Sequence, residues 1–97
     1  MLDKASLKSL SLYHYPSCPF CAVTRQAMSG TELDIELRDI RKNPQHRSTL
    51  VQQGGKSQVP CLRIETTEGK VQWLYESADI IRFIQRYSHQ AAAKLAS

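Results

Sequence analysis

The sequence predicts an α/β domain built on a four-stranded mixed sheet with helices on both faces. Two observations support this class: short segments in which apolar and polar residues alternate, and longer segments with apolar residues at helical spacing. Proline and glycine residues separate these segments. The expected order is strand, helix, strand, helix, strand, strand, helix. Because a helix joins the first two strands, they are expected to be parallel with a right-handed crossover.

The first strand is expected around Leu10 and Leu12, which alternate with polar neighbours. The first helix is expected to begin at Pro19, with Cys18 as its N-cap, because proline is favoured at the first helical position. Gly30 is a suitable residue to end this helix. The apolar face of the helix is expected to contain Phe20, Val23, Ala27 and Met28.

The second strand and the second helix follow directly. Leu33, Ile35 and Leu37 alternate with charged residues, which predicts a strand with one core-facing side. Asn43 as the N-cap and Pro44 as the first helical residue predict a helix that runs to about residue 53 and ends at a glycine pair.

Two strands and a helix complete the predicted fold. The strands are expected at residues 61–65 and 71–75, and the glycine-bearing turn between them predicts an antiparallel hairpin. The last helix is expected to begin near Ser77 and to carry an apolar stripe. That stripe contains Ile80, Ile81, Phe83, Ile84 and Tyr87.

The length of 97 residues predicts one domain, 1–97, with its core at about 8–88. The tail, 89–97, has few apolar anchors and is expected to fray. The formal net charge is +4, but the basic residues are scattered, which argues against nucleic-acid binding. A basic surface suits small acidic ligands and acidic partner proteins. We expect a monomer.

The cysteine content indicates a reducing compartment. Three cysteines do not make the larger, even set of a secreted disulfide scaffold. The first ten residues contain no apolar signal core, and no apolar segment is long enough to span a bilayer. The sequence therefore predicts a cytoplasmic protein with no membrane partner.

Cys18 and Cys21 form a Cys-x-x-Cys motif at the junction of the first strand and the first helix, a pattern typical of thiol–disulfide chemistry. A sulfur at a helix N-cap faces unpaired backbone N–H groups and the positive end of the helix dipole, and both stabilise a thiolate. A free cysteine with a pKa of about 8.5 is only roughly 3% thiolate at pH 7. Cys18 is therefore the expected nucleophile, and Cys21, which the helix shields, is the expected resolving thiol.

Two other roles for the motif fit the residues less well. A disulfide across this four-residue ring would remove only about 2 kcal/mol of unfolded-state entropy, which disfavours a structural role. Half of a zinc site is an alternative, but a closed site needs four ligands. The remaining candidate ligands form no second closely spaced pair: Cys61, His14, His46 and His89. No metal is expected, and Cys61 is expected to be a small core residue.

With Cys18-Pro19-Phe20-Cys21 after the first strand and Val59-Pro60 before the third, the chain resembles the thioredoxin superfamily and, within it, the glutaredoxin family. The resemblance extends over about residues 9–87. Phe20 stands where glutaredoxins carry tyrosine, and Gln58 stands where threonine is usual. The resemblance implies a thioredoxin-like fold and a cis peptide bond between Val59 and Pro60. From the residues alone, Pro60 could simply open a strand.

The resemblance also implies glutathione as cosubstrate. Glu76-Ser77 departs from the Gly-Gly-Cys-Asp pattern of glutaredoxins and resembles the Glu-Ser segment of the glutathione transferase N-terminal domain, which holds the γ-glutamyl end of glutathione. Helix N–H groups suit its carboxylate, and Glu76 suits its ammonium; the alternative is that Ser77 is only an N-cap. The implied glutathione-binding residues are Tyr15, Phe20, Val59, Pro60, Glu76 and Ser77.

One residue before the motif departs from the family pattern. Glutaredoxins usually place a lysine three residues before the first cysteine, whereas this chain has Tyr15 there. The Tyr15 hydroxyl can donate a hydrogen bond to a thiolate or a carboxylate but carries no full charge. His14 is an alternative source of charge below its pKa. Arg41 and Lys56 are alternatives for binding the glycyl carboxylate of glutathione.

The sequence therefore predicts a glutathione-dependent thiol–disulfide oxidoreductase in which Cys18 and Cys21 reduce protein disulfides or glutathione mixed disulfides. Its expected partners are glutathione and disulfide-bearing or glutathionylated proteins. Two alternatives are a non-catalytic glutathione-binding module and a carrier that bridges an iron–sulfur cluster through Cys18 and glutathione. Transferase chemistry is disfavoured, because those enzymes add a helical domain for which 97 residues leave no room.

Overall fold

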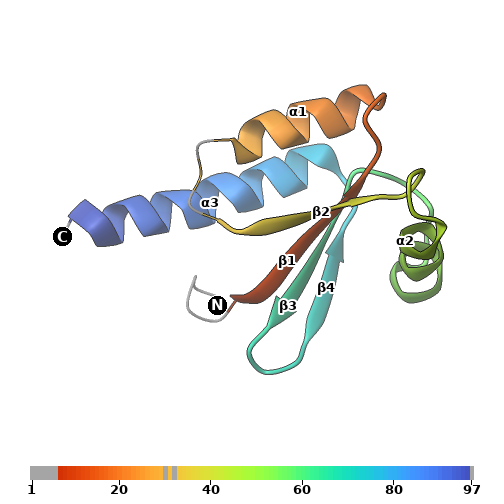
Figure 1. Ribbon diagram of the computed structural model, residues 1–97. Coiled ribbons are helices and arrows are strands. Elements are labelled where there is room, and N and C mark those ends of the chain that lie inside the picture. The colour runs from red at the N-terminus through yellow and green to blue at the C-terminus, as the bar shows by residue number, and fades with distance from the viewer. Residues whose placement is uncertain (1–6, 30, 32, 97) are drawn as a thin grey trace.

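The computed structural model describes residues 7–29, 31 and 33–96, with side chains as far as Tyr87. The elements follow the predicted order (Figure 1). They are β1 (Leu7–His14), α1 (Pro19–Met28), β2 (Ile35–Asp39), α2 (Pro44–Thr49), a π-helical segment η2 (Leu50–Gly54), β3 (Cys61–Thr66), β4 (Val71–Leu74) and α3 (Ser77–Ala96). The α/β class is therefore confirmed.

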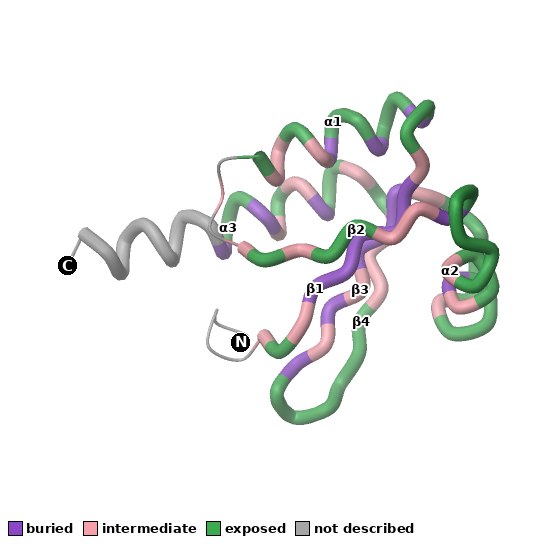
Figure 2. Tube along the Cα trace, in the orientation of Figure 1, coloured by how far each residue is buried: buried purple, intermediate pink, exposed green. Residues whose placement is uncertain are grey.

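The four strands form one mixed sheet in the order β2-β1-β3-β4. β1 and β2 are parallel, with Leu12 opposite Leu37. β3 is antiparallel to both β1 and β4. The parallel first pair and the antiparallel hairpin are thus as predicted. β1 and β3 lie at the centre of the sheet and are buried along most of their length (Figure 2).

The larger core cluster lies between the sheet and the pair of helices α1 and α3, which run side by side (Figure 1). Alternate residues of the two central strands point into it, and the predicted stripe of α3 supplies the other side. Its buried members are Leu10, Leu12, Leu62, Ile64, Ile80 and Ile84. A smaller cluster on the opposite face contains Tyr13, Ile40, Leu50 and Cys61.

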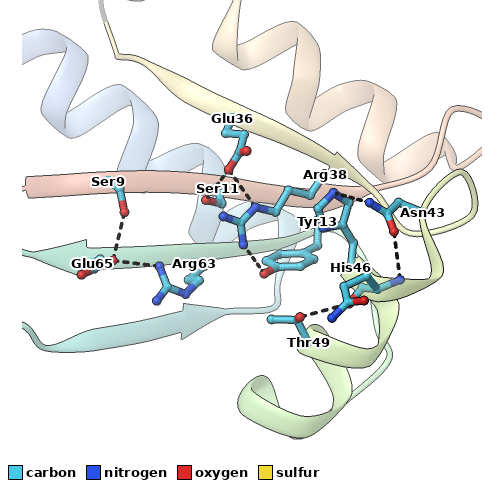
Figure 3. Close-up of polar contacts among 11 residues, drawn as sticks. Ser9, Ser11, Tyr13, Glu36, Arg38, Asn43, His46, Thr49, Arg63 and Glu65 are labelled. Carbon is cyan, nitrogen blue, oxygen red and sulfur yellow. Dashed lines mark hydrogen bonds and ion pairs between the residues drawn. The ribbon is translucent and has the colours of Figure 1, made fainter.

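Beyond the smaller cluster, the opposite face of the sheet is polar (Figure 3). Arg38 pairs with Glu36 at 2.8 Å, and Arg63 pairs with Glu65 at 3.2 Å. The Ser9 hydroxyl donates to Glu65 at 3.3 Å. Each of these charged groups has a partner on the same face. Because its side chains are polar, this part of the face can lie against water.

Helix α1 buries a different face from the one predicted. Phe20 is 65% exposed and Val23 is 54% exposed, whereas Cys21 and Thr24 are fully buried. The Thr24 hydroxyl donates to the Phe20 carbonyl at 2.8 Å, which satisfies it inside the core. The predicted apolar face of this helix was therefore wrong for Phe20 and Val23. Met28 does pack against the core as expected.

The exposure of Leu37 and the start of the second strand also differ from the predictions. Leu37 is 50% exposed because β2 is an edge strand, and Leu33 precedes the strand. The backbone of α3 is helical to Ala96, which includes most of the segment expected to fray. Its alanine-rich end has strong helix formers. Gly30, the expected end of the first helix, lies outside the described residues.

No helix in the described part of the chain has the length and apolarity to cross a membrane.

Leu12 and its neighbour Leu37 allow a direct test of this core. Leu12 is fully buried, so Leu12→Ala is expected to lower the free energy of unfolding by about 2–5 kcal/mol, because it leaves a cavity. Leu37 is half exposed, so Leu37→Ala is expected to change it by no more than about 0.5 kcal/mol. Urea denaturation measures both. Equal losses would place Leu37 in the core and contradict this description.

Candidate active site

The two cysteines of the motif lie at the start of α1, as predicted. Cys18 is the N-cap, with extended backbone at φ −81° and ψ 120°, and Pro19 is the first helical residue. The backbone N–H of Cys21 donates to the Cys18 sulfur at 3.3 Å. The N–H of Ala22 donates to the Cys18 carbonyl at 3.0 Å and closes the first turn. The sulfur thus receives a hydrogen bond that a thiolate accepts better than a thiol.

Access differs between the two thiols. Cys18 keeps 5% of its surface exposed, and Cys21 has none. This order agrees with an attacking first cysteine and a shielded second one, although the exposed fraction of Cys18 is small for a residue at the tip of a helix. Cys61 is also fully buried, in agreement with its expected place in the core.

The electrostatics separate the two thiols further. Burial raises the pKa of Cys18, but hydrogen bonds from the Cys21 side chain and from the backbone of Cys21 and Phe20 outweigh it, and the pKa is lowered overall. The Tyr15 hydroxyl contributes in the same direction. Burial, with a smaller effect of Cys18, raises the pKa of Cys21 to about 12. Burial likewise raises the pKa of Cys61 to about 12. Of the three thiols, only Cys18 is favoured as a thiolate.

Arg25 holds the turn that leads into the motif. Its guanidinium donates to His14 Nδ1 at 2.9 Å, to the Tyr15 carbonyl at 3.4 Å and to the Pro16 carbonyl at 3.3 Å. The Tyr15 carbonyl also accepts the Cys18 N–H at 3.2 Å. No role for Arg25 was predicted from the sequence. Its position four residues after Cys21, on the same helix face, is the signal that could have indicated it.

His14 does not supply the charge considered for it. The residue is 7% exposed. Burial and the Arg25 guanidinium lower its pKa, and Asp39 opposes them only in part. An imidazole that accepts from Arg25 is neutral, so the alternative in which His14 supplies charge was wrong. The cause is the end of β1, which pairs with Asp39 of β2 and is covered by Arg25 of α1.

Arg41 brings a positive charge to the position where the family lysine is missing. Its guanidinium carbon lies 3.9 Å from the centre of the Tyr15 ring, and its Nη1 donates to the Ser17 hydroxyl at 3.1 Å. Lys56, the other alternative, lies farther from its aromatic neighbour, with Nζ 5.4 Å from the centre of the Tyr75 ring. Arg41 therefore contacts the residue before Cys18, whereas the Lys56 side chain lies over Tyr75.

The Val59–Pro60 peptide bond is cis, as the resemblance implied. Beside it lies a pocket of about 130 Å³ that collects residues from three separate parts of the chain. Its lining consists of Phe20, Gln58, Val59, Pro60, Tyr75, Glu76 and Ser77. Five of the six residues predicted to bind glutathione thus meet in one pocket. The sixth, Tyr15, lies outside this lining and contacts Cys18 instead.

The start of α3 forms one wall of this pocket. Ser77 is the first residue of the helix, and the Glu76 carbonyl accepts the N–H of Ile80 at 2.9 Å. The N–H groups of the first turn are therefore directed toward the pocket end of the helix. Among the described residues, no group of three or more histidine, cysteine or acidic side chains is arranged to hold a metal ion.

A four-stranded mixed sheet with a Cys-x-x-Cys motif capping the first helix and a cis-proline before the third strand defines a thioredoxin-like protein. A solved thioredoxin-like protein matches with a TM-score of 0.61 and 19% identity, over 76% of this chain and 97% of that one. A glutaredoxin from Brucella melitensis matches with a TM-score of 0.54 and 15% identity, over 95% of each chain. These two show the fold.

The family model described as glutaredoxin matches residues 10–68, and the chain belongs to the glutaredoxin family. A maleylacetoacetate isomerase from Anaeromyxobacter dehalogenans, solved with glutathione bound in its active site, is similar at 28% identity with a TM-score of 0.52. That match covers 84% of this chain but 38% of the isomerase. The comparison with curated protein sequences found no match.

The difference between the thiols predicts selective alkylation. Iodoacetamide at neutral pH is expected to modify Cys18 and to leave Cys21 and Cys61 unmodified. When the alkylation rate of Cys18 is followed across pH, its midpoint is expected to lie below the value of about 8.5 for a free cysteine. Mass spectrometry of pH-quenched samples measures this. In Cys21→Ala the midpoint is expected to rise, because the Cys21 side chain is the largest contribution that lowers the pKa of Cys18. Cys61→Ala is the matched control and should leave it unchanged; equal labelling of Cys18 and Cys61 would contradict the prediction.

Proposed function

We propose that the protein is a glutathione-dependent thiol–disulfide oxidoreductase in which Cys18 is the nucleophile. The observation that carries this proposal is the Cys18 sulfur at the N-cap of α1, where it accepts the Cys21 N–H at 3.3 Å and has a lowered pKa. The pocket beside the cis Val59–Pro60 bond supports glutathione as the cosubstrate, since it contains the Glu76-Ser77 pair. Membership of the glutaredoxin family supports the same redox role.

The proposed reaction removes glutathione from a protein mixed disulfide. The Cys18 thiolate attacks the glutathione sulfur, the protein–glutathione S–S bond breaks, and the protein sulfur leaves as a thiolate that takes up a proton. Cys18 then carries glutathione as a disulfide. A second glutathione, after losing its thiol proton, attacks the glutathione sulfur of this adduct. Oxidised glutathione leaves, and the Cys18 thiolate is restored.

Cys21 serves the reduction of protein disulfides. After Cys18 has formed a mixed disulfide with a protein, the Cys21 thiol loses its proton and attacks the Cys18 sulfur, which releases the reduced protein. Two glutathione molecules then reduce the Cys18–Cys21 disulfide. The high pKa of Cys21 results mainly from burial and partly from its interaction with Cys18, and the second part disappears once Cys18 is in a disulfide. Cys21 thus becomes a better nucleophile at the stage that needs it.

Each end of glutathione has a proposed binding group. The γ-glutamyl carboxylate lies at the first N–H groups of α3, and Glu76 binds the ammonium. The cysteinyl backbone pairs with Val59, between Pro60 and Phe20. For the glycyl carboxylate we assign Arg41 rather than Lys56, because Arg41 stacks on Tyr15 and donates to Ser17, next to Cys18.

One observation favours a second function, a non-catalytic glutathione-binding module. Cys18 is only 5% exposed, which limits the approach of a protein disulfide. The two functions differ in turnover: a module binds glutathione but does not reduce a mixed disulfide faster than glutathione alone does.

Cysteine variants test the catalytic assignment. Cys18→Ser is expected to reduce the glutathione-coupled reduction of a mixed disulfide to the uncatalysed rate, because the nucleophile is lost. Cys21→Ser is expected to retain this activity but to lose the reduction of protein disulfides, which needs the second thiol. Assays with both substrates measure the two activities. Undiminished mixed-disulfide reduction by Cys18→Ser would refute the proposal, and no turnover by the wild type would favour the binding module.

Arg41 has its own test. Arg41→Met is expected to raise the KM for a glutathione mixed disulfide about tenfold with little change in kcat, because a charge-assisted hydrogen bond to the bound ligand is lost. Lys56→Met, which removes the other nearby cation, is the matched control with a smaller expected effect. Steady-state kinetics of both variants give the answer. A larger effect in Lys56→Met would transfer the carboxylate site to Lys56.

A further inference from the structure

The chain carries an uneven distribution of charge around the proposed active site. No aspartate or glutamate occurs between Asp39 and Glu65, whereas residues 41–56 contain four basic residues. We call these four the cationic rim: Arg41, Lys42, Arg47 and Lys56. All four are exposed, and none forms an ion pair with a carboxylate that the structure describes. The ion pairs that the structure describes lie on the sheet, in the β3–β4 turn and on α3.

Both ends of the cationic rim contact the active-site region. At one end, Arg41 stacks on Tyr15 and donates to the Ser17 hydroxyl. At the other end, the Lys56 N–H donates to the hydroxyl of Tyr75, which lines the pocket. Between them, α2 lies at the same end of the sheet as the first turn of α1 (Figure 1). The cationic rim therefore runs from the residue before Cys18 to a residue that lines the pocket.

Two carboxylates, those of Asp39 and Glu76, lie near this end of the site. Asp39 Oδ1 accepts the backbone N–H groups of Arg41 and Lys42 at 2.9 and 3.0 Å, so it is engaged in the turn that begins the segment. Glu76 lies across the pocket on the wall formed by α3. The segment that contains α2 therefore contributes basic side chains to the site, whereas the α3 side contributes the acidic Glu76.

We infer that the cationic rim selects acidic protein substrates, namely glutathionylated or disulfide-bearing proteins with carboxylates flanking the reactive cysteine. This inference rests on the proposed function and adds the substrate class. Unpaired exposed charges attract an oppositely charged partner during the encounter, and the effect weakens as salt screens it. A protein substrate is favoured over a nucleic acid because the four cations flank a thiol and include no continuous basic run.

The test compares two glutathionylated cysteine peptides of equal length, one with aspartates flanking the cysteine and one with lysines in those places. The mixed disulfide of glutathione with 2-mercaptoethanol is the reference substrate. In each reaction the Cys18 thiolate attacks the glutathione sulfur, and the peptide or mercaptoethanol leaves as a thiolate that takes up a proton. The wild type is expected to show a kcat/KM about tenfold higher for the acidic peptide at about 20 mM salt. The ratio should fall toward one at about 500 mM salt.

A charge-reversed rim gives the decisive comparison. Lys42→Glu/Arg47→Glu is expected to abolish the preference for the acidic peptide while it leaves kcat/KM for the reference substrate unchanged. The matched control is Lys8→Glu/Lys70→Glu, which changes the net charge equally at exposed positions on β1 and beside the β3–β4 turn. The control should keep the preference, because net charge alone does not produce it.

The outcomes separate the two levels of the proposal. Turnover of the reference substrate with equal kcat/KM for both peptides would overturn the inference and leave the proposed function intact. No turnover of any substrate would overturn both. A preference lost equally in the rim variant and the control would mean that net charge, not the rim, attracts the substrate, which also contradicts the inference. A labelled oligonucleotide that binds at low salt and displaces the acidic peptide would contradict it as well.

Discussion

The hydrogen bond from the Cys21 N–H to the Cys18 sulfur is the interaction on which the rest of the site depends. At 3.3 Å it requires Cys18 to remain extended at the N-cap while the helix begins at the very next residue, Pro19. This geometry gives the sulfur a donor that favours its anionic form and buries the second sulfur one turn later. The sheet positions this helix start because it determines where β1 ends: Tyr13 pairs with Cys61 of β3 just before the turn.

The backbone of this fold is largely predictable because its signals are local. Asn43-Pro44 marks the start of α2, and alternation marks the strands. The buried face of α1 was not predictable in the same way. A stripe of large apolar residues was expected to face the core, but the core accepts Cys21 and Thr24 and leaves Phe20 in solvent. Thr24 can be buried because its hydroxyl bonds within its own helix, and a count of hydrophobic residues does not detect this.

The residues of the candidate site likewise fall into those that local sequence predicts and those that it does not. Residues that belong to a motif, such as Cys18 and the Glu76-Ser77 pair, were predicted because neighbours in the sequence define them. Arg25 and Arg41 act through side chains that reach across the fold. The spacing of Arg25 from Cys21 indicates only a shared helix face, and no motif identifies the groups that either arginine contacts. Arg25 binds mostly backbone carbonyls, which every residue carries, so its role depends on how α1 packs beneath the turn. Arg41 was one of two alternatives for the glycyl carboxylate, and its stacking on Tyr15 is the reason that we propose it.

The Arg25 contacts have a consequence for how the protein accommodates ligands of different shape. They join the turn before Cys18 to the body of α1, so Cys18 and its helix form one wall of the site that is held by several hydrogen bonds. The segment 55–58, on the other side of the site, is built differently. Its residues are exposed, Gly55 adopts a left-handed φ of 93°, and the Lys56 N–H donates a hydrogen bond to the Tyr75 hydroxyl. We therefore expect residues 55–58 to change position when ligands of different size bind, while Cys18 and the turn before it keep theirs.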